Sequence, residues 1–168
     1  MTTTALVRHA RTSDVRAIRA LIDLYADDRI LLSKATVTLF EDVQEFYVAE
    51  VDGLVVGCGA LHVLWEDLAE VRTLAVDPSL RGQGIGRALL ARLLEQARAV
   101  GITRVFTLTF ETDFFASHGF AEIDGTPVSH EVFEQLLQSY DEGVAEFLGL
   151  ERVKPNTLGN TRMLLVLS

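Results

Sequence analysis

Residues 74–90 read Leu-Ala-Val-Asp-Pro-Ser-Leu-Arg-Gly-Gln-Gly-Ile-Gly-Arg-Ala-Leu-Leu and form the strongest local pattern in the chain. An apolar run at 71–76 overlaps its start and is typical of a buried strand that ends at Asp77-Pro78. Apolar residues then recur at helical spacing, at Ile85, Leu89, Leu93, Ala97 and Val100. Three glycines therefore lie between a strand and the first turn of a helix.

This glycine-rich turn suits an anionic ligand. The first N–H groups of a helix have no intrahelical partners, and the helix dipole is positive there. Gly82, Gly84 and Gly86 have no Cβ, so an anion can approach several backbone amides. Arg81 and Arg87 add a positive charge at each edge of the turn. The pattern therefore predicts a phosphate or pyrophosphate ligand.

Two well-known phosphate-binding motifs fit this turn poorly. A P-loop ends in Gly-Lys-Ser/Thr, and no lysine follows these glycines. A dinucleotide fingerprint needs a third glycine where the chain has Leu89. The remaining pattern, Arg-x-x-Gly-x-Gly with Asp77-Pro78 ahead of Arg81, resembles the acetyl-CoA signature of the GNAT acetyltransferases. The alternative is a glycine-rich turn that binds no ligand.

Composition limits the partners of the chain. Its 168 residues and hydrophobic content of 49% fit a single domain, 1–168. The formal charge of −9 argues against a nucleic-acid partner. No apolar run is long enough to cross a membrane and no secretory segment follows Met1, so we expect a cytoplasmic protein. The single cysteine, Cys58, lies in an apolar strand and is expected to be a core residue, and no metal is expected.

The order of the predicted elements also resembles the GNAT fold, an α/β (α+β) architecture in which helices flank a central mixed, mostly antiparallel sheet. We predict strands at 6–9, 46–51, 54–65, 70–76, 104–109, a segment through 123, and 163–167. One helix is predicted from an N-cap at Ser13 to its end at Asp27-Asp28, and others at about 37–44 and 85–100. A short helix containing Phe114 and Phe115 is predicted after a cap at Thr112 or Asp113. One departure from the family is a helical insertion at about 126–151, for which Thr126-Pro127 is the predicted start. The insertion is expected either to cover the acceptor site or to form a homodimer contact.

The GNAT resemblance implies direct attack of an amine on the thioester of acetyl-CoA. It also implies that the strand before the glycine turn binds the pantetheine and polarises the thioester through its backbone. The expected cofactor-binding residues are Leu74, Ala75, Val76, Arg81, Gly82, Gln83, Gly84, Ile85, Gly86, Arg87 and Phe115.

Two residues are candidates for proton transfer. A carboxylate can accept the proton of the attacking amine, and period-two alternation places Glu70, Arg72, Leu74 and Val76 on one strand face. Glu70 is therefore the predicted general base, and the alternative is a surface glutamate at a strand edge. Many family members protonate the leaving thiolate with a tyrosine where this chain has Phe114-Phe115. Thr109, Ser117 or water would replace it, or the thiolate leaves unaided; we take Thr109 as the candidate proton donor.

Other segments resemble the acetyltransferase domain of N-acetylglutamate synthases, most closely the short, single-domain actinobacterial type. They are 69–76, 108–109, 114–120 and 153–164, together with the insertion. This resemblance implies glutamate, or alternatively glutamine, as acceptor in the first step of arginine synthesis. A dicarboxylate acceptor needs cations, and we expect two of Lys34, Arg72, Lys154 and Arg162 to bind it, with Asn160 as a further candidate.

Two other functions remain open at this stage. The protein could acetylate another small amine or a protein N-terminus, which an acidic acceptor groove would favour. It could instead be a CoA-binding sensor without turnover, which only the Phe114-Phe115 departure supports.

Overall fold

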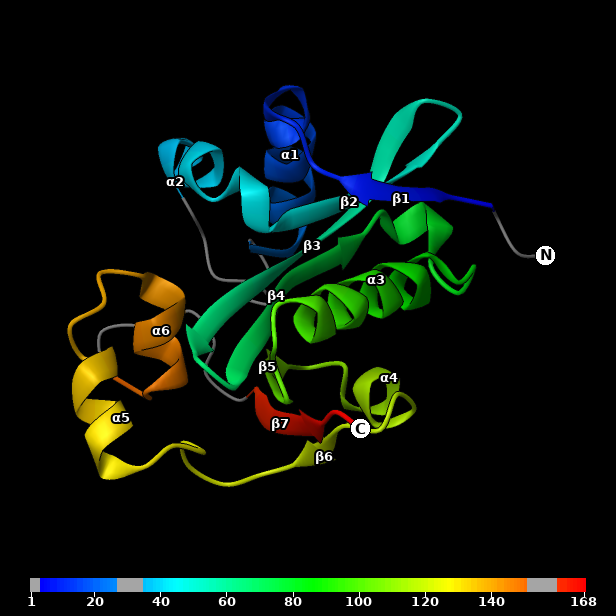
Figure 1. The fold of residues 1–168 in the computed structure, drawn as a ribbon. Coiled ribbons are helices and arrows are strands. Elements are labelled where there is room, and N and C mark those ends of the chain that lie inside the picture. The colour runs from blue at the N-terminus through cyan, green and yellow to red at the C-terminus, as the bar shows by residue number, and fades with distance from the viewer. Residues whose placement is uncertain (1–3, 27–34, 151–159) are drawn as a thin grey trace.

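The computed structural model describes residues 4–26, 35–150 and 160–168. Within these ranges the chain builds one seven-stranded sheet, in the order β1-β2-β3-β4-β5-β7-β6 (Figure 1). Only β4 and β5 pair in parallel among its neighbouring strands, which confirms the predicted mixed, mostly antiparallel sheet. The strands are β1 (Leu6–His9), β2 (Phe46–Val51), β3 (Leu54–Trp65), β4 (Leu68–Val76), β5 (Arg104–Thr109), β6 (Ala121–Glu122) and β7 (Thr161–Val166).

Helices cover both faces of this sheet. They are α1 (Val15–Ala26), α2 (Thr36–Glu41), α3 (Ile85–Ala99), α4 (Thr112–Ala116), α5 (His130–Leu136) and α6 (Glu142–Phe147). Short 3-10 turns lie at Thr12–Asp14, Val43–Glu45 and Pro78–Leu80. No helix of the described ranges is both long and apolar enough to span a bilayer.

Three apolar clusters hold the layers together. On one face, α3 and α4 bury residues such as Leu89, Leu93 and Phe115 against the sheet. On the other face, α1 and α2 form a second cluster around Ile18 and Ile22. The third cluster lies on that same face, where α5 and α6 pack over β3, β4, β5 and β7 (Figure 1).

Cys58 belongs to the cluster under α1 and is fully buried. Burial raises the pKa of its thiol to about 12, which makes the thiolate nucleophile rare near neutral pH. The expectation of a core cysteine is confirmed.

The insertion is helical, but its start differs from the prediction. The first helix begins at His130, not at Thr126-Pro127, and the Ser129 hydroxyl caps it by accepting from the Val132 N–H at 3.3 Å. The Pro127 carbonyl instead accepts from Arg104 Nη1 at 2.7 Å, so a tertiary contact uses the group that a helix would need. Helices α5 and α6 lie on the sheet face beside β4 and β5, and a homodimer contact through them stays a prediction.

A β-bulge in β4 changes which side chains face which layer. Ala60 of β3 pairs with Arg72 and Cys58 pairs with Ala75, so two β4 residues oppose one β3 residue. Thr73 lies in the bulge with a φ of 57°, a left-handed conformation that is costly for a β-branched residue. The predicted common face of Glu70, Arg72, Leu74 and Val76 is therefore wrong. After the bulge, Leu74 and Val76 pack toward α3, whereas Glu70 and Arg72 face the opposite side.

Strands β4 and β5 separate soon after they meet. Their parallel pairing ends at Glu70 and Phe106. The next contact is a hydrogen bond from the Thr107 hydroxyl to the Val71 carbonyl, at 3.0 Å. Beyond this point the two strands line opposite sides of a cavity.

Candidate active site

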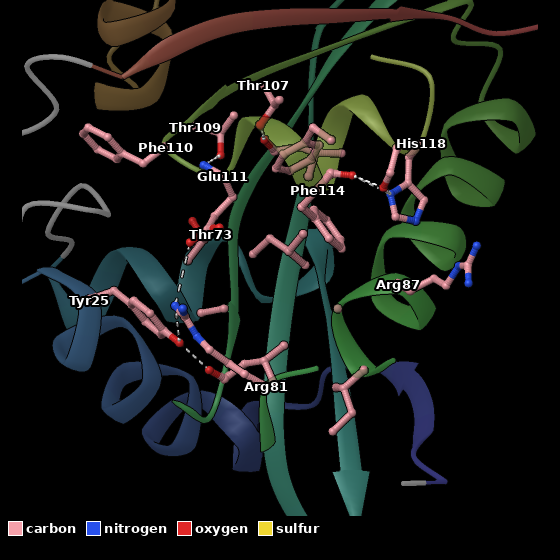
Figure 2. Close-up of a pocket in the computed structure, with 18 of the residues that line it drawn as sticks. Tyr25, Thr73, Arg81, Arg87, Thr107, Thr109, Phe110, Glu111, Phe114 and His118 are labelled. Carbon is pink, nitrogen blue, oxygen red and sulfur yellow. Dashed lines mark hydrogen bonds and ion pairs between the residues drawn. The ribbon is translucent and has the colours of Figure 1, made fainter. Parts of the chain in front are cut away.

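The cavity between β4 and β5 has a volume of about 540 Å³ and continues to the glycine turn before α3 (Figure 2). Ten of the eleven predicted cofactor-binding residues line it; Gln83 does not. The predicted residues that do are Leu74, Ala75, Val76, Arg81, Gly82, Gly84, Ile85, Gly86, Arg87 and Phe115.

The glycine turn has the backbone geometry of a helix N-terminus. Gly84 is the N-cap of α3 with a φ of 86°, and its carbonyl accepts from the Ala88 N–H at 3.1 Å. Just upstream, the Asp77 carboxylate accepts from the Ser79 N–H and hydroxyl, which fixes the turn after β4. The first turn of α3 contains no acidic residue. This end of a fifteen-residue helix therefore retains its positive potential toward the cavity.

Arg81 is held at the cavity by a residue that the sequence did not single out, Tyr25 of α1. The Arg81 guanidinium lies 5.5 Å from the centre of the Tyr25 ring, and Nη2 is 3.4 Å from the phenol oxygen. The Tyr25 hydroxyl donates to the Val76 carbonyl, and Arg81 also lies 3.9 Å from the Glu111 carboxylate (Figure 2). The arginine thus connects α1, the end of β4 and the start of α4. No local pattern would have placed Tyr25 there, because the contact spans 51 residues.

A polar strip separates the two apolar clusters on the sheet face that carries α1, α2, α5 and α6. It consists of His62 of β3 with Glu70 and Arg72 of β4, and Glu70 pairs across the strands with His62. Glu70 is only 2% exposed, so the alternative of a surface glutamate is wrong. Its side chain does not line the cavity, whereas Arg72 does.

Arg72 joins two carboxylates. Its Nε and Nη2 donate to Glu70 Oε1, at 3.3 and 2.8 Å, and its Nη1 donates to Asp141 Oδ1 at 2.8 Å. Burial alone would lower the pKa of this guanidinium, but the two adjacent carboxylates raise it well above the ordinary value. Burial likewise opposes ionisation of Asp141, yet the charge of Arg72 holds the pKa of that carboxyl below its usual value. Glu70, Arg72 and Asp141 therefore form a triad joined by two ion pairs, in which Glu70 and Arg72 are buried and Asp141 is partly buried.

Thr109 ends β5 at the cavity and is mostly buried. Its hydroxyl oxygen accepts from the Glu111 N–H at 2.7 Å, so its own proton remains available to another acceptor. Ser117, the alternative proton source, also lines the cavity but donates to the Phe114 carbonyl at 2.6 Å. Of these two hydroxyls, that of Thr109 is the better placed to donate to a ligand.

The acceptor-binding candidates fall into three groups. Lys34 and Lys154 lie outside the described residues. Arg72 belongs to the triad, and Arg162 donates to backbone carbonyls of Phe147, Glu146 and Gly125, at 2.7, 3.1 and 3.2 Å. Asn160 directly precedes β7 and is partly exposed. Both described arginines therefore bind protein groups, and sequence spacing did not indicate the partners Asp141, Glu146 and Phe147 because these belong to the insertion.

His118 is another cavity residue that the sequence reading missed. Its Nδ1 lies 2.8 Å from the Phe114 carbonyl, so Nδ1 donates to that oxygen. Nε2 is buried and finds no hydrogen-bond partner in the part of the chain that the structure describes. Figure 2 shows the ring beside Phe114, on the side of the cavity where Arg87 lies. The His-Gly-Phe sequence at 118–120 suggested only a turn into the next strand.

Similarity to known proteins agrees with this geometry. Residues 5–125 match the Acetyltransferase (GNAT) family. An amino-acid acetyltransferase of Mycobacterium tuberculosis is 64% identical over 165 residues, covering 96% of this chain and 94% of that protein.

Solved structures give the same result. A crystal structure of a Mycobacterium tuberculosis protein in complex with CoA and a second ligand has a TM-score of 0.94 at 64% identity, covering 97% of this chain and 99% of that chain. N-acetylglutamate synthase from Neisseria gonorrhoeae, complexed with coenzyme A and N-acetyl-glutamate, has a TM-score of 0.78 at 26% identity. That match covers all of this chain but 36% of the longer protein. The chain therefore belongs to the GNAT acetyltransferase family, as its glycine turn predicts.

Proposed function

We propose that this protein transfers the acetyl group of acetyl-CoA to the α-amine of an amino acid, glutamate or glutamine. One observation carries the proposal: the gap between β4 and β5 connects an anion-binding helix N-terminus to Arg72, which is paired with Glu70. The name and structures of the Mycobacterium tuberculosis relatives support an amino-acid acceptor. Such a reaction is the first step of arginine synthesis and belongs in the cytoplasm, where acetyl-CoA and amino acids meet.

The residues around the glycine turn fit the cofactor. Backbone amides at the start of α3 and the charges of Arg81 and Arg87 would hold the pyrophosphate of CoA. The β4 backbone at 74–76 would lie along the pantetheine and polarise the thioester carbonyl. Phe115, buried at the cavity wall, would give the chain of the cofactor an apolar surface.

Glu70 would accept the proton of the attacking amine, directly or through a water. A free α-amino group has a pKa of about 8 and is mostly protonated at neutral pH, so the attack needs a proton acceptor. Both contacts from Arg72 go to Oε1 of Glu70, which leaves Oε2 outside the ion pair. That second oxygen is the one we assign to proton transfer.

Thr109 would donate a proton to the leaving thiolate. Its hydroxyl accepts a backbone N–H and retains its own proton, and it lies at the end of β5 on the cavity wall. Recognition of the acceptor carboxylates would fall to Lys34, Lys154 and Asn160. Arg72 would contribute through its charge while it remains bound to Glu70 and Asp141.

The test is thiol release from acetyl-CoA with glutamate, glutamine, aspartate, lysine and a short peptide as acceptors. We expect saturable release with glutamate or glutamine, and Glu70→Gln should lower kcat by about 100-fold, in the range of a lost general base. Lys34→Ala or Lys154→Ala should raise KM for the amino acid and leave KM for acetyl-CoA unchanged.

Two results would contradict the proposal. Release with lysine or the peptide alone would favour a different amine acceptor. Tight CoA binding without release for any acceptor would favour a sensor.

A further inference from the structure

Two arginines of the sheet hold the two ends of α6. Arg72 of β4 binds Asp141, the N-cap of the helix, and Arg162 of β7 binds the carbonyls of Glu146 and Phe147 at its other end. The Arg162 guanidinium also lies 5.5 Å from the centre of the Phe106 ring, and Phe106 is the cross-strand neighbour of Glu70. Helix α6 is thus attached to the sheet at both of its ends, through Arg72, which binds Glu70, and through Arg162, which lies over the strand neighbour of Glu70.

The position of the Asp141 carboxylate is determined by the helix that it caps. Its Oδ1 accepts from the Val144 N–H at 2.9 Å and from Arg72 Nη1 at 2.8 Å. The backbone N–H of Asp141 donates to the Ser139 hydroxyl at 3.1 Å. One oxygen therefore serves both the helix and the arginine, so a shift of α6 moves the arginine as well.

The α6 backbone itself lies against the guanidinium. A Cβ added at Gly143 would lie 2.5 Å from Arg72 Nη2 and 2.7 Å from Nη1, far closer than van der Waals contact. The guanidinium of Arg72 is held by three neighbours. Its Nε and Nη2 bind Glu70, and its Nη1 binds Asp141. Gly143 lies against both terminal nitrogens, so the guanidinium has one allowed orientation. That orientation keeps Arg72 on Oε1 of Glu70.

We propose that Asp141 is a positioning residue for the reaction: it holds Arg72, and Arg72 holds Glu70 with Oε2 directed to the acceptor amine. This inference rests on the proposed role of Glu70. It also makes α6, a helix of the insertion, a part of the catalytic apparatus.

The decisive variant is Asp141→Ser, because serine is also a good N-cap and keeps α6 capped while the ion pair to Arg72 is lost. We expect kcat to fall about 10- to 100-fold, as for a misoriented reacting group, with KM for acetyl-CoA within twofold of wild type. Asp141→Asn keeps an Oδ1 that can accept from both Arg72 and the Val144 N–H, so its kcat should fall less than that of Asp141→Ser. The matched control is Ser129→Ala, which removes the N-cap of α5 in the same insertion and should leave kcat unchanged.

Glu70→Gln, measured in parallel, separates this inference from the proposed function. If Glu70→Gln keeps its kcat, the proposed base is wrong. If Glu70→Gln is slow while both Asp141 variants keep their kcat, only the positioning role is wrong. In the double variant Glu70→Gln/Asp141→Ser, kcat should be no lower than in Glu70→Gln, since the triad acts through that carboxylate. Two results would contradict the inference. One is a double variant in which the two single-variant losses in kcat multiply, and the other is a loss of kcat in Ser129→Ala equal to that in Asp141→Ser.

Discussion

The Thr107 hydroxyl donates to the Val71 carbonyl, at 3.0 Å, one residue past the last paired position of β4 and β5. Both residues line the cavity, and Thr107 is buried. This hydrogen bond is the last link between the two strands before they separate, so it sets the width of the gap at its closed end.

Thr107→Val retains the shape of the side chain and removes that link. We expect a loss of about 1–3 kcal/mol in the free energy of unfolding, since a buried carbonyl loses its donor. KM for acetyl-CoA should rise as well. Urea unfolding and steady-state kinetics measure the two effects. Thr103→Val is the control, because the exposed Thr103 hydroxyl contacts the Asp67 carbonyl at 3.4 Å and should contribute little. Equal losses in the two variants would contradict this role for Thr107.

Gly143→Ala tests the contact between α6 and Arg72. Inside an exposed helix, alanine is more stable than glycine by about 0.8–1 kcal/mol. Here we expect the opposite sign, a loss of about 1–3 kcal/mol from overpacking against the guanidinium, together with a lower kcat. Gly125→Ala is the comparison, because a Cβ there meets no atom within 4 Å, although its φ of 71° carries some strain. A stabilised, fully active Gly143→Ala variant would show that α6 does not press on Arg72.

Thr109→Val and Thr109→Ser test the proton donor. Valine removes the hydroxyl, and kcat should fall by about 10-fold or more, as for loss of a general acid. Serine retains both the acceptor for the Glu111 N–H and the proton, so kcat should stay near wild type. The valine defect should shrink above the ordinary thiol pKa of about 8.5, because a thiolate then leaves without a donor. A defect that is constant across the pH range would assign Thr109 a purely structural role.

His118→Asn removes Nε2 and retains an amide donor near the position of Nδ1, so the hydrogen bond to the Phe114 carbonyl can persist. We expect the free energy of unfolding to stay constant or rise, since a buried acceptor without a described partner is removed. CoA affinity should stay within about twofold of wild type, because the buried Nε2 has no exposed surface from which to accept a hydrogen bond from the cofactor. Calorimetric titration with CoA measures this. The exposed His130 gives the control, His130→Ala, and a lower free energy of unfolding in His118→Asn would show that Nε2 makes a stabilising contact.

Asp14 gives a pH-dependent stability. Arg8 donates to both of its carboxylate oxygens, at 2.8 and 3.0 Å, and this contact, with the Arg11 N–H, lowers the pKa of the Asp14 carboxyl. A lowered pKa in the folded state stabilises the protein above the unfolded-state pKa of about 3.9, and this stabilisation is lost as the pH falls through the folded-state pKa.

The free energy of unfolding of Asp14→Asn should therefore be about 2–3 kcal/mol lower than that of wild type at pH 7, the range for a hydrogen-bonded charged group. The difference from wild type should narrow steadily in urea unfolding below pH 4. The control is Asp23→Asn, because Asp23 is exposed and pairs with Arg19 on the surface of α1. This variant should lose less than about 0.5 kcal/mol in its free energy of unfolding, both at pH 7 and below pH 4. A difference for Asp14→Asn that stays constant down to acid pH would contradict the ion pair as the cause.

Local patterns predicted most of this fold. The glycine turn and the β5 bounds follow from short-range residue preferences, and the structure agrees. The start of the insertion was misplaced because a long-range bond from Arg104 uses the Pro127 carbonyl.

The site was harder to predict because it depends on contacts between distant segments. Strict alternation failed at Thr73, since a β-branched residue gives no local sign of a left-handed bulge. Arg72 and Arg162 were two of the four candidate cations for the acceptor, and nothing in the spacing indicated that they also bind Asp141 and helix carbonyls. The Asp141 position did carry a weak signal, an acidic residue directly before an apolar helical segment, but nothing in the spacing linked it to β4.

The short pairing of β4 with β5 has a thermodynamic consequence. Within the described ranges, three paired positions, the Thr107 bond and the hydrogen bonds of Arg104 to Asp67 join a four-stranded part of the sheet to a three-stranded part. A ligand bound in the gap contacts both parts of the sheet at once. It occupies the space in which β4 and β5 would otherwise continue to pair. The affinity of this ligand is then linked to the stability of the whole domain. Above saturation, each tenfold rise in ligand concentration adds about 1.4 kcal/mol to the free energy of unfolding.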